Sequence, residues 1–543
     1  MTERSGDPIG DLRIRVRAAM AGISGASATA EPSFERPPKP EFGDFSTNAA
    51  LLLAPGAGEQ PRKLAERLGE SLANPEIERV EVAGPGFLNI FLADDFFTGA
   101  VDAINEAGAD FGSDVAADRA QRVLVEFVSA NPTGPATVAS GRHAAYGDSL
   151  ARILSFAGHA VEREYYMNDA GEQIRKFGES IGARAAGGEV PEGGYEGDYV
   201  AELGDELSGG GIDPGETDEL ARRGVELMRE RIEGTLERFR VHFDRFFSER
   251  SLHESGALAA AVDQVAGAGQ TYESEGALWM RTSEFGDDKD RVVRRGDGQP
   301  SYFAADIAYH RDKLERGYGL LIDVLGADHH GYVPRLSAAV EVLGGSAEAF
   351  EVPIIQLVQI VEGGERAKMS KRRGDFVTLD ELIDDIGVDA ARFFLVQRSH
   401  ETPIDLDLEL ARKRSNENPV YYVQYAHARI KTMFRKRSQG DEAAGGPSTE
   451  ADPGPLEPSE RALILRLLEL PAQVERAELR REPHGLGAYA REVAADFHAF
   501  YRDCPVLKAP EPIRARRLAV CSATATVIAT TLGLLGTEAP EEM

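Results

Sequence analysis

Cysteine is scarce in this 543-residue chain, which contains only Cys504 and Cys521, with sixteen residues between them. No CxxC pair is present, so these cysteines can build neither a disulfide framework nor a four-ligand zinc site. Such sparse use of cysteine favours a reducing compartment. The first twenty residues carry charges throughout and lack the continuous apolar stretch of a signal peptide. Together these features predict a cytoplasmic protein.

Positive charge is also in short supply, because 61 basic side chains face 91 acidic ones and leave a formal net charge of -30. This excess argues against a protein that coats DNA or an anionic membrane with its whole surface, although one local basic groove remains possible. Long uncharged runs are rare as well. Residues 518–536 form a run long enough to suggest a membrane span, but five hydroxyl side chains interrupt it. We interpret this run as a buried helix and expect no membrane partner.

The sequence is long enough for three or four domains, and 42% hydrophobic with 28% charged residues is the balance of a folded globular protein. Residues 1–115 combine helical periodicity with two short strands around a Gly-Pro-Gly turn at 80–92, which predicts a small α/β domain. Residues 406–543 have helical patterns, broken by a linker at 439–458 that is rich in glycine, proline and acids.

Residues 116–405 show strands that alternate with helices. Residues 122–129 are a continuous apolar run, typical of a strand buried on both faces, and a loop, a helix at 141–156 and a second strand follow. Strand signals resume at 320–326 and 352–361, after a polar, glycine-rich segment at about 169–290. We interpret the pattern as one doubly wound, Rossmann-like parallel sheet with an insertion. The predicted fold class is therefore α/β.

Two loops of this central region carry candidate chemistry. Residues 130–140 join a buried strand to a helix N-terminus, where ligands collect in an open parallel sheet and exposed N–H groups favour phosphate. Two prolines and a glycine at 131–135 let a flat group approach the backbone, although an ordinary rigid loop explains this stretch equally well by itself. Residues 365–376 place four cations within six positions. That composition suits a mobile loop closing on a polyphosphate, while a solvated basic loop is the commoner outcome.

These motifs resemble those of bacterial arginyl-tRNA synthetases. VEFVSANPTGP followed by GRHAAYGDSLARIL resembles the first signature region of that family, and AKMSKRRGDFVTL resembles its KMSKS region. Similar stretches run from GDFSTNAALLLA near the N-terminus to LGLLGTEAPEEM at the C-terminus. The resemblance implies a class I synthetase with a Rossmann-like catalytic domain, an N-terminal domain for the tRNA elbow and an all-α anticodon-binding domain.

The resemblance also implies the reaction, which is adenylation of L-arginine by ATP with Mg²⁺ and transfer of the arginyl group to the 3′ end of the cognate tRNA by a monomer. A guanidinium group needs fixed carboxylates, because bidentate charge-assisted hydrogen bonds give geometric selectivity. Glu126 and Asp306 match the acids that bind it in the family, although Glu126 could instead pair with a structural arginine. Asn131 matches the residue that handles the α-amino and carboxylate end. Tyr302 and Asp328 complete the expected arginine site.

The family's ATP site implies a further set of residues. Lys371, supported by Lys368, is expected to stabilise the charge that grows on pyrophosphate as it leaves. Where the family has HxGH, this chain has TVAS, so the hydroxyls of Thr137 and Ser140 replace two imidazoles. Hydroxyls can hydrogen-bond phosphate but bring no positive charge. The remaining expected ATP contacts are Gly134, Pro135, Gly141, His329, Met369 and Ser370.

The lost histidines keep one alternative function open, a catalytically weakened paralogue that binds tRNA as a regulatory module. His143 lies one helical turn after Ser140 and could compensate, although a surface histidine without a special role is the commoner outcome. The Asp328-His329-His330 trio suggests a metal site, but no nearby spacing supplies the further ligands that one needs. We expect no protein-bound metal.

The candidate tRNA surface is the segment 413–437, in which tyrosines alternate with cations and so offer stacking faces beside phosphate contacts. Some of these tyrosines must pack in the core of a helical bundle, because adjacent positions cannot all face outward. The expected tRNA contacts are Tyr421, Tyr425, Arg429 and Lys431, with Asn48 and Asn89 in the N-terminal domain.

Overall fold

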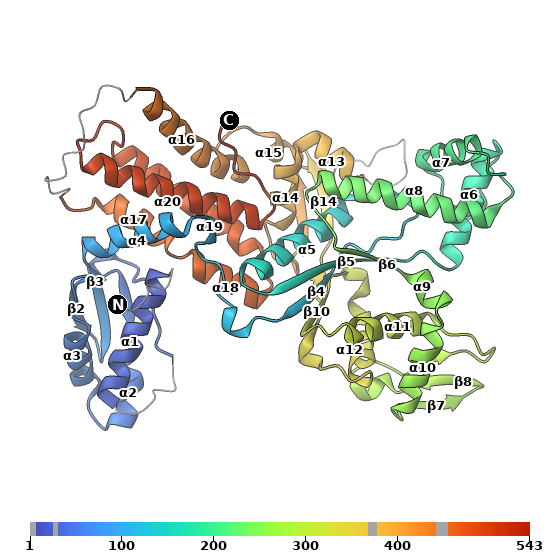
Figure 1. Cartoon of the computed structure of the whole chain (residues 1–543), viewed down its shortest axis with the longest axis horizontal. Coiled ribbons are helices and arrows are strands. Elements are labelled where there is room, and N and C mark those ends of the chain that lie inside the picture. The colour runs from blue at the N-terminus through green and yellow to red at the C-terminus, as the bar shows by residue number, and fades with distance from the viewer. Residues whose placement is uncertain (1–6, 25–30, 367–376, 441–453) are drawn as a thin grey trace.

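The computed structural model describes residues 7–24, 31–366, 377–440 and 454–543. The N-terminal region packs helices on a small antiparallel sheet, in which β3 lies between β1 and β2 (Figure 1). Its strands are β1 (Phe45–Thr47), β2 (Ile77–Ala83) and β3 (Phe87–Leu92), and its helices are α1 (Pro8–Ser24), α2 (Ala49–Ala57), α3 (Pro61–Ser71) and α4 (Asp94–Ala107). The hairpin of β2 and β3 confirms the two strands expected at 80–92.

The centre of the molecule is a five-stranded parallel sheet in the order β12-β10-β4-β5-β6. Its strands are β4 (Arg122–Glu126), β5 (Ala160–Met167), β6 (Arg245–Ser248), β10 (Leu320–Asp323) and β12 (Phe350–Glu351). The helices around it include α5 (Val138–Phe156), α11 (Tyr302–Glu315) and α12 (Val333–Val342).

Both faces of this sheet are covered, as β4 shows. Val123 and Val125 belong to the core cluster that contains the buried face of α5, whereas Leu124 packs with Leu336 and Val340 of α12 on the opposite face. Apolar side chains are thus buried on both faces, which is why this strand reads as a continuous apolar run. The predicted doubly wound sheet is confirmed.

The segment 169–290 supplies more than an insertion, because β6 from this segment is the edge strand of the main sheet, next to β5. The rest forms two groups that lie at one end of the molecule in Figure 1. The first group contains α6 (Glu172–Ala185), α7 (Asp198–Gly209) and α8 (Thr217–Arg238). The second contains α9 (Glu249–Glu254), α10 (Ala257–Gly267), β7 (Thr271–Ser274) and β8 (Ala277–Met280), and β8 pairs with β9 (Arg291–Arg294) just beyond the segment. The domain boundaries at 115 and 405 stay predictions.

The apolar run 352–361 was expected to be one strand of the main sheet, and this expectation is wrong. It divides into β13 (Ile354–Ile355), which pairs with β11 (Leu325–Gly326), and β14 (Val358–Glu362), which pairs with β15 (Glu365–Arg366) and β16 (Ile404–Asp407). Between the two strands, the buried Arg142 of α5 donates hydrogen bonds to the carbonyls of Gln356 (2.6 Å) and Leu357 (3.2 Å). These carbonyls are satisfied by a side chain, so the ladder can break there.

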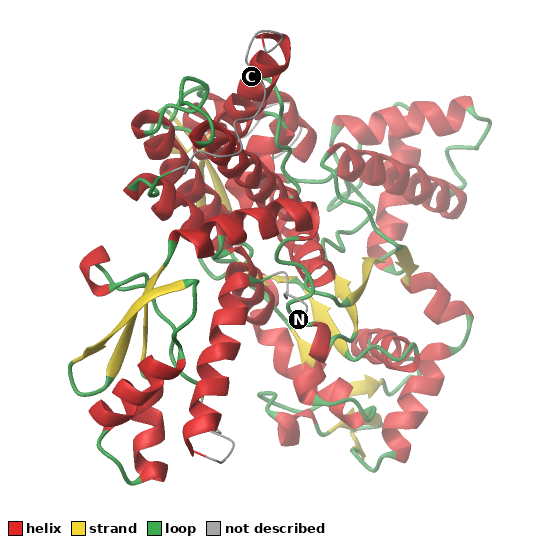
Figure 2. Ribbon diagram, turned by 60° about the vertical axis from the view of Figure 1, so that its left-hand side comes forward, coloured by secondary structure: helices red, strands yellow, loops and turns green. Residues whose placement is uncertain are grey.

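Two helices, α13 (Leu379–Ile386) and α14 (Val388–Val396), precede β16. After β16 the described residues form helices only, as predicted for 406–543. These are α15 (Leu408–Arg412), α16 (Pro419–Gly440), α17 (Pro458–Leu467), α18 (Leu470–Arg480), α19 (His484–Asp503) and α20 (Ile513–Leu534). Within the described ranges, α20 is the one helix long and apolar enough to cross a membrane, and 67% of its most apolar window is buried. It packs against α4, α16 and α19, as expected for a core helix. Figure 2 shows the N-terminal strands and the central strands as separate groups, with helices of the C-terminal bundle above the N-terminal ones.

Helix α5 lies very close to the end of β4, and a glycine makes this possible. A Cβ atom on Gly147 would lie 2.2 Å from Cγ of Phe127, whose side chain is fully buried. Gly234, by contrast, lies inside α8 with nothing within 4 Å of its Cβ position.

We therefore expect Gly147→Ala to destabilise the protein by about 1 to 3 kcal/mol or more, because overpacking forces the neighbouring backbone to shift. The matched control, Gly234→Ala, removes a helix-interior glycine without a clash and should be neutral or stabilising by up to about 1 kcal/mol. Thermal unfolding of both variants checks this. Equal midpoints would contradict the close approach of α5 to β4.

Candidate active site

The carboxyl ends of the parallel strands carry a group of polar side chains. Glu126 is the last residue of β4, Tyr166 is next to last in β5, and Glu249 directly follows β6. Burial raises the pKa of the Tyr166 hydroxyl, and the nearby charges of Glu249, Asp306 and Glu126 raise it further. Three carboxylates from different elements therefore act on one hydroxyl group. This edge is where ligands bind in open α/β sheets.

Glu126 has a fixed position and a cationic partner. Only 6% of this residue is exposed, Lys313 of α11 donates to its Oε2 atom at 2.5 Å, and Ser129 Oγ donates to Oε1 at 2.8 Å. Burial raises the pKa of Glu126, and the charge of Lys313 opposes this effect. Glu126 thus pairs with a buried lysine and not with the structural arginine that the alternative named, and its role in binding arginine stays a prediction.

The backbone after Glu126 is strained. Val128 has φ +68° and Ser129 has φ +43°, in the left-handed region that β-branched residues avoid. This turn lets the Ser129 hydroxyl both donate to Glu126 and accept from the Tyr166 backbone N–H at 3.2 Å. Strained residues of this kind persist where the surrounding structure determines them, and they cluster at functional sites.

Lys313 joins two carboxylates that face each other across the sheet. Asp323, the last residue of β10, is paired in register with Glu126, and Lys313 donates to Asp323 Oδ1 at 2.7 Å. His310 Nε2 lies 3.1 Å from Asp323 Oδ2, and its Nδ1 lies 2.8 Å from the backbone carbonyl of Asp306. Burial alone would raise the pKa of Asp323, but Lys313 and His310 lower it to about 2.

Asp306, on the first turns of α11, is the second expected guanidinium-binding acid. Tyr332 donates a hydrogen bond to its Oδ2 atom at 3.1 Å. Burial raises the pKa of Asp306 to about 6, although His310 and Tyr332 partly oppose the shift. No cation forms an ion pair with the Asp306 carboxylate among the described residues. Glu126 and Asp306 both act on the Tyr166 hydroxyl, and their binding of a guanidinium stays a prediction.

Thr137 caps α5, and the two loops with candidate chemistry meet beside it. Its Oγ1 atom accepts from the Ser140 N–H and lies 3.2 Å from the Ser140 hydroxyl. The Val138 N–H donates to the Val377 carbonyl at 3.1 Å, and the Leu379 N–H donates to Ala136 at 2.8 Å. The segment that follows the cationic loop is therefore attached to the first loop. Lys368, Met369, Ser370 and Lys371 lie outside the described residues.

Other residues of the first loop have structural partners. Asn131 is exposed and donates to Gln173 of α6 at 2.7 Å. A Cβ atom on Gly141 would lie 2.7 Å from Leu379 Cδ1, so packing requires this glycine. Gly134 and Pro135 are half-buried, and the Tyr199 hydroxyl closes this side of the loop by donating to the Thr133 carbonyl at 2.8 Å. The ATP-binding roles of these residues stay predictions.

His143 is not the surface residue that we considered more common. Its Nδ1 atom is buried with no hydrogen-bond partner, and burial lowers its pKa to about 4. A neutral imidazole supplies no positive charge to replace the lost histidines. Asp328 and His329 are mostly exposed and approach each other at 3.4 Å, while Tyr302 is 72% exposed with Arg295 over its ring. Their roles stay predictions.

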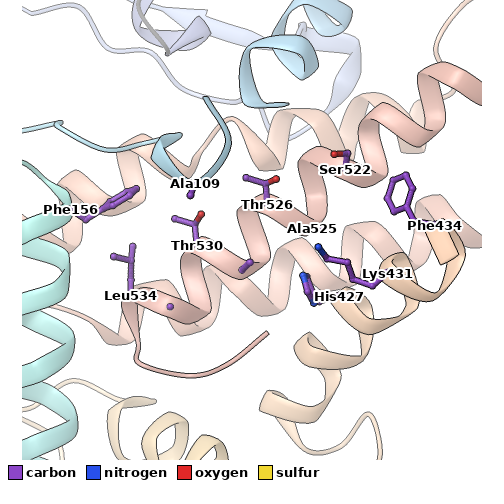
Figure 3. Close-up of a pocket in the computed structure, with 12 residues that line it drawn as sticks. Ala109, Phe156, His427, Lys431, Phe434, Ser522, Ala525, Thr526, Thr530 and Leu534 are labelled. Carbon is purple, nitrogen blue, oxygen red and sulfur yellow. The ribbon is translucent and has the colours of Figure 1, made fainter. Parts of the chain in front are cut away.

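The four expected tRNA contacts on α16 do not form one surface. The rings of Tyr421 and Tyr425 stack with centroids 6.1 Å apart, and Arg429 lies 4.7 Å from the Tyr425 centroid. Lys431 projects from a different face, where it lines a cavity of about 660 Å³ between α16 and α20 (Figure 3). Tyr422, as expected for part of this run, packs in the bundle against His498.

The two asparagines of the N-terminal region differ in exposure. Asn48 is half-buried and accepts from the Ser33 N–H at 2.8 Å. Asn89 lies on the central strand β3 with only 8% of its surface exposed, which does not favour contact with a base.

Sequence reasoning missed Lys313, His310 and Asp323. The signal was present, because His310 and Lys313 follow Asp306 by four and seven residues and so share one helix face. Asp323 ends an apolar strand, as Glu126 does. Within the part of the chain that the structure describes, no group of three or more His, Cys, Asp or Glu side chains is placed to hold a metal ion.

Comparison with known proteins identifies the family. Residues 11–92 match the arginyl tRNA synthetase N-terminal domain, 211–417 the class I (R) tRNA synthetase catalytic domain and 423–543 the DALR anticodon binding domain. The chain is 46% identical to the arginine–tRNA ligase of Frankia alni, with 97% of each chain covered, and 44% identical to that of Halorhodospira halophila, with 94% and 95% covered. Its fold matches the Thermus thermophilus arginyl-tRNA synthetase with a TM-score of 0.76, at 24% identity, over 98% of this chain and 100% of that one. The chain belongs to the arginyl-tRNA synthetase family, and its catalytic domain is of class I.

Proposed function

We propose that this protein is an arginine–tRNA ligase that adenylates L-arginine with Mg-ATP and transfers it to the 3′ end of its cognate tRNA. The observation that carries the proposal is that Glu126 and Asp306 both lie near the Tyr166 hydroxyl at the carboxyl edge of the sheet, close enough for their charges to act on it. Asp306 has no ion-pair partner among the described residues, so it offers an acceptor to a guanidinium. Nothing in the comparisons or the site favours the regulatory alternative.

In the proposed first step, the arginine carboxylate attacks the α-phosphorus of ATP. A carboxylate oxygen–phosphorus bond forms, the bond to the β-phosphate oxygen breaks, and pyrophosphate leaves with Mg²⁺. Glu126 and Asp306 hold the guanidinium, and Asn131 with Tyr302 and Asp328 orients the rest of the amino acid. The hydroxyls of Thr137 and Ser140 lie at the positive end of the α5 dipole, where phosphate is favoured.

The leaving pyrophosphate is assigned to the cationic loop. Lys371, with Lys368, stabilises its growing charge, while Met369 and Ser370 join Gly134, Pro135, Gly141 and His329 around the nucleotide. In the second step, a hydroxyl of the terminal tRNA ribose attacks the arginyl carbonyl and AMP leaves.

For tRNA, we assign the exposed face of Tyr421, Tyr425 and Arg429 to stacking and phosphate contacts, with Lys431 on a second face and Asn48 in the N-terminal region. We propose a monomer that works in the cytoplasm. Both cysteines are free and buried, which fits a reducing compartment.

The substrate assignment is tested by substrate choice and by two variants. Citrulline should not be used, because its neutral side chain leaves the carboxylates unmatched. Glu126→Gln or Asp306→Asn should weaken arginine use by about 100-fold or more, since removing one partner of a buried charge pair costs about 3 to 5 kcal/mol. Amino-acid-dependent ATP–pyrophosphate exchange with tRNA present measures both. Comparable turnover of citrulline by the unaltered enzyme would refute the proposal.

The raised pKa of Asp306 predicts that the affinity for L-arginine falls at acid pH. The charged carboxylate binds the guanidinium, so binding should be complete well above pH 6 and should weaken as pH falls below about 6. Groups facing Asp306 are His310, Tyr332, Glu249 and Arg335. Titration calorimetry of L-arginine between about pH 5 and 8 should show this loss of binding on the acid side. If Asp306→Asn showed the same pH dependence of arginine affinity, this loss of binding could not be assigned to the Asp306 carboxyl group.

The TVAS sequence yields a separate prediction. If Ser140 hydrogen-bonds a phosphate oxygen, Ser140→Ala should remove about 1.5 to 3 kcal/mol, or roughly ten- to 150-fold in adenylation rate. Ser155→Ala, an exposed hydroxyl at the other end of α5, is the matched control and should change nothing. Single-turnover adenylation measures the rate.

Histidines at both Thr137 and Ser140 should give no large gain, because Thr137 already caps the helix. A silent Ser140→Ala together with a strongly active double-histidine variant would instead indicate a damaged ATP site.

A further inference from the structure

The contacts around Lys313 form a continuous hydrogen-bonded chain that none of the expected roles explains. It runs from Glu126 through Lys313 to Asp323 and on to His310, with donor–acceptor distances of 2.5, 2.7 and 3.1 Å. All four side chains are nearly inaccessible, with side-chain exposures of 8%, 0%, 4% and 3%. A fully buried lysine ordinarily loses its charge, so the two carboxylates are what keeps it protonated.

His310 links Asp323 to the helix that carries Asp306. Its Nδ1 atom lies 2.8 Å from the backbone carbonyl of Asp306, and its Nε2 atom lies 3.1 Å from Asp323 Oδ2. Both ring nitrogens therefore have a partner, and the ring bridges the end of β10 and the backbone of α11.

Lys313 does not satisfy all the acids of this region. It donates to Glu126 and Asp323, whereas the Asp306 carboxylate forms no ion pair among the described residues. Of the two carboxylates that the proposed function assigns to the guanidinium, Glu126 therefore has a fixed partner and Asp306 is left for the ligand.

We infer that Lys313, Asp323 and His310 form a buried relay that positions Glu126 and Asp306 for a guanidinium group. Lys313 holds the Glu126 carboxylate in position before the substrate binds. His310, through its contact with the backbone carbonyl of Asp306, holds the turn of α11 that carries Asp306. These three are positioning residues, since none of them is assigned to contact the substrate. The inference rests on the proposed function, and it adds residues that determine specificity for that same site.

A double-mutant cycle between Lys313 and Glu126 tests the relay. Lys313→Met removes the charge with little change in volume, and we expect the KM for L-arginine to rise at least about ten-fold while kcat and the KM for ATP change less than about three-fold. If Lys313 acts through Glu126, the double variant Lys313→Met/Glu126→Gln should have the arginine KM of Glu126→Gln alone. Exchange assays and calorimetric binding of L-arginine are both measured.

Arg316→Met is the matched control. Arg316 directly follows the same helix as its C-cap and also pairs with a fully buried carboxylate, Glu164, at 2.7 and 2.8 Å, but it does not touch the relay. This variant should lose stability without a change in the arginine KM. Lys313→Arg, which keeps the cation, should recover part of the arginine affinity lost in Lys313→Met.

The outcomes are distinguishable. The relay is refuted if Lys313→Met leaves the arginine KM unchanged. It is also refuted if the fold-changes of KM in the two single variants multiply in the double variant. In either case the ligase assignment stands. If Lys313→Met does not fold, the double variant is used in its place, because it removes the charges of both Lys313 and Glu126. Its arginine KM is then compared with that of Glu126→Gln: equal values support the relay, and a higher KM in the double variant refutes it. If the unaltered enzyme binds no arginine, the proposed function itself fails.

Discussion

The candidate site depends on one buried contact, the ammonium group of Lys313 between Glu126 and Asp323. These carboxylates end neighbouring parallel strands and are paired in register, so without a cation two like charges would meet where water does not reach. A buried charge without a partner costs several kcal/mol. Lys313 therefore allows both strands of the sheet to end in an acid, and α11, which carries it, brings Asp306 to the same edge.

Such a contact is a poor way to obtain stability alone, because well-packed apolar residues would often serve as well as a buried ion pair. The burial of Glu126 and Asp306 is better explained by a cationic ligand that they bind. Asp306 forms no ion pair among the described residues, and burial raises the pKa of both Glu126 and Asp306, so a bound cation would stabilise their charged forms. The strained turn at Val128 and Ser129 also serves this arrangement, because it directs a hydroxyl to Glu126.

Much of the fold could be predicted from the sequence, because apolar runs and helical periodicity record which faces are buried. The strand at 122–126 and the helix that follows were evident for this reason. The strand expected at 352–361 was wrong, since an apolar run does not reveal that Arg142, distant in sequence, replaces a ladder partner. The edge strand β6 was also missed, because it is short and lies in a polar segment.

The site was only partly predictable. Glu126 and Asp306 were found through resemblance and because an acid at the end of an apolar strand needs an explanation. Lys313 and His310 were missed, although their spacing from Asp306 was visible, because helical spacing shows that residues share a face but not what lies opposite. The exposure of Lys431 on a different face of α16 from Tyr425 was predictable from the same periodicity.

The central claim is that Glu126 and Asp306 together receive one guanidinium group. A crystal structure of the protein with L-arginine bound tests it most directly. We expect the guanidinium nitrogens within hydrogen-bond distance of both carboxylates, with the contacts of Lys313 to Glu126 and Asp323 retained. An arginine whose guanidinium lies elsewhere, with Glu126 still bonded only to Lys313 and Ser129, would contradict the account.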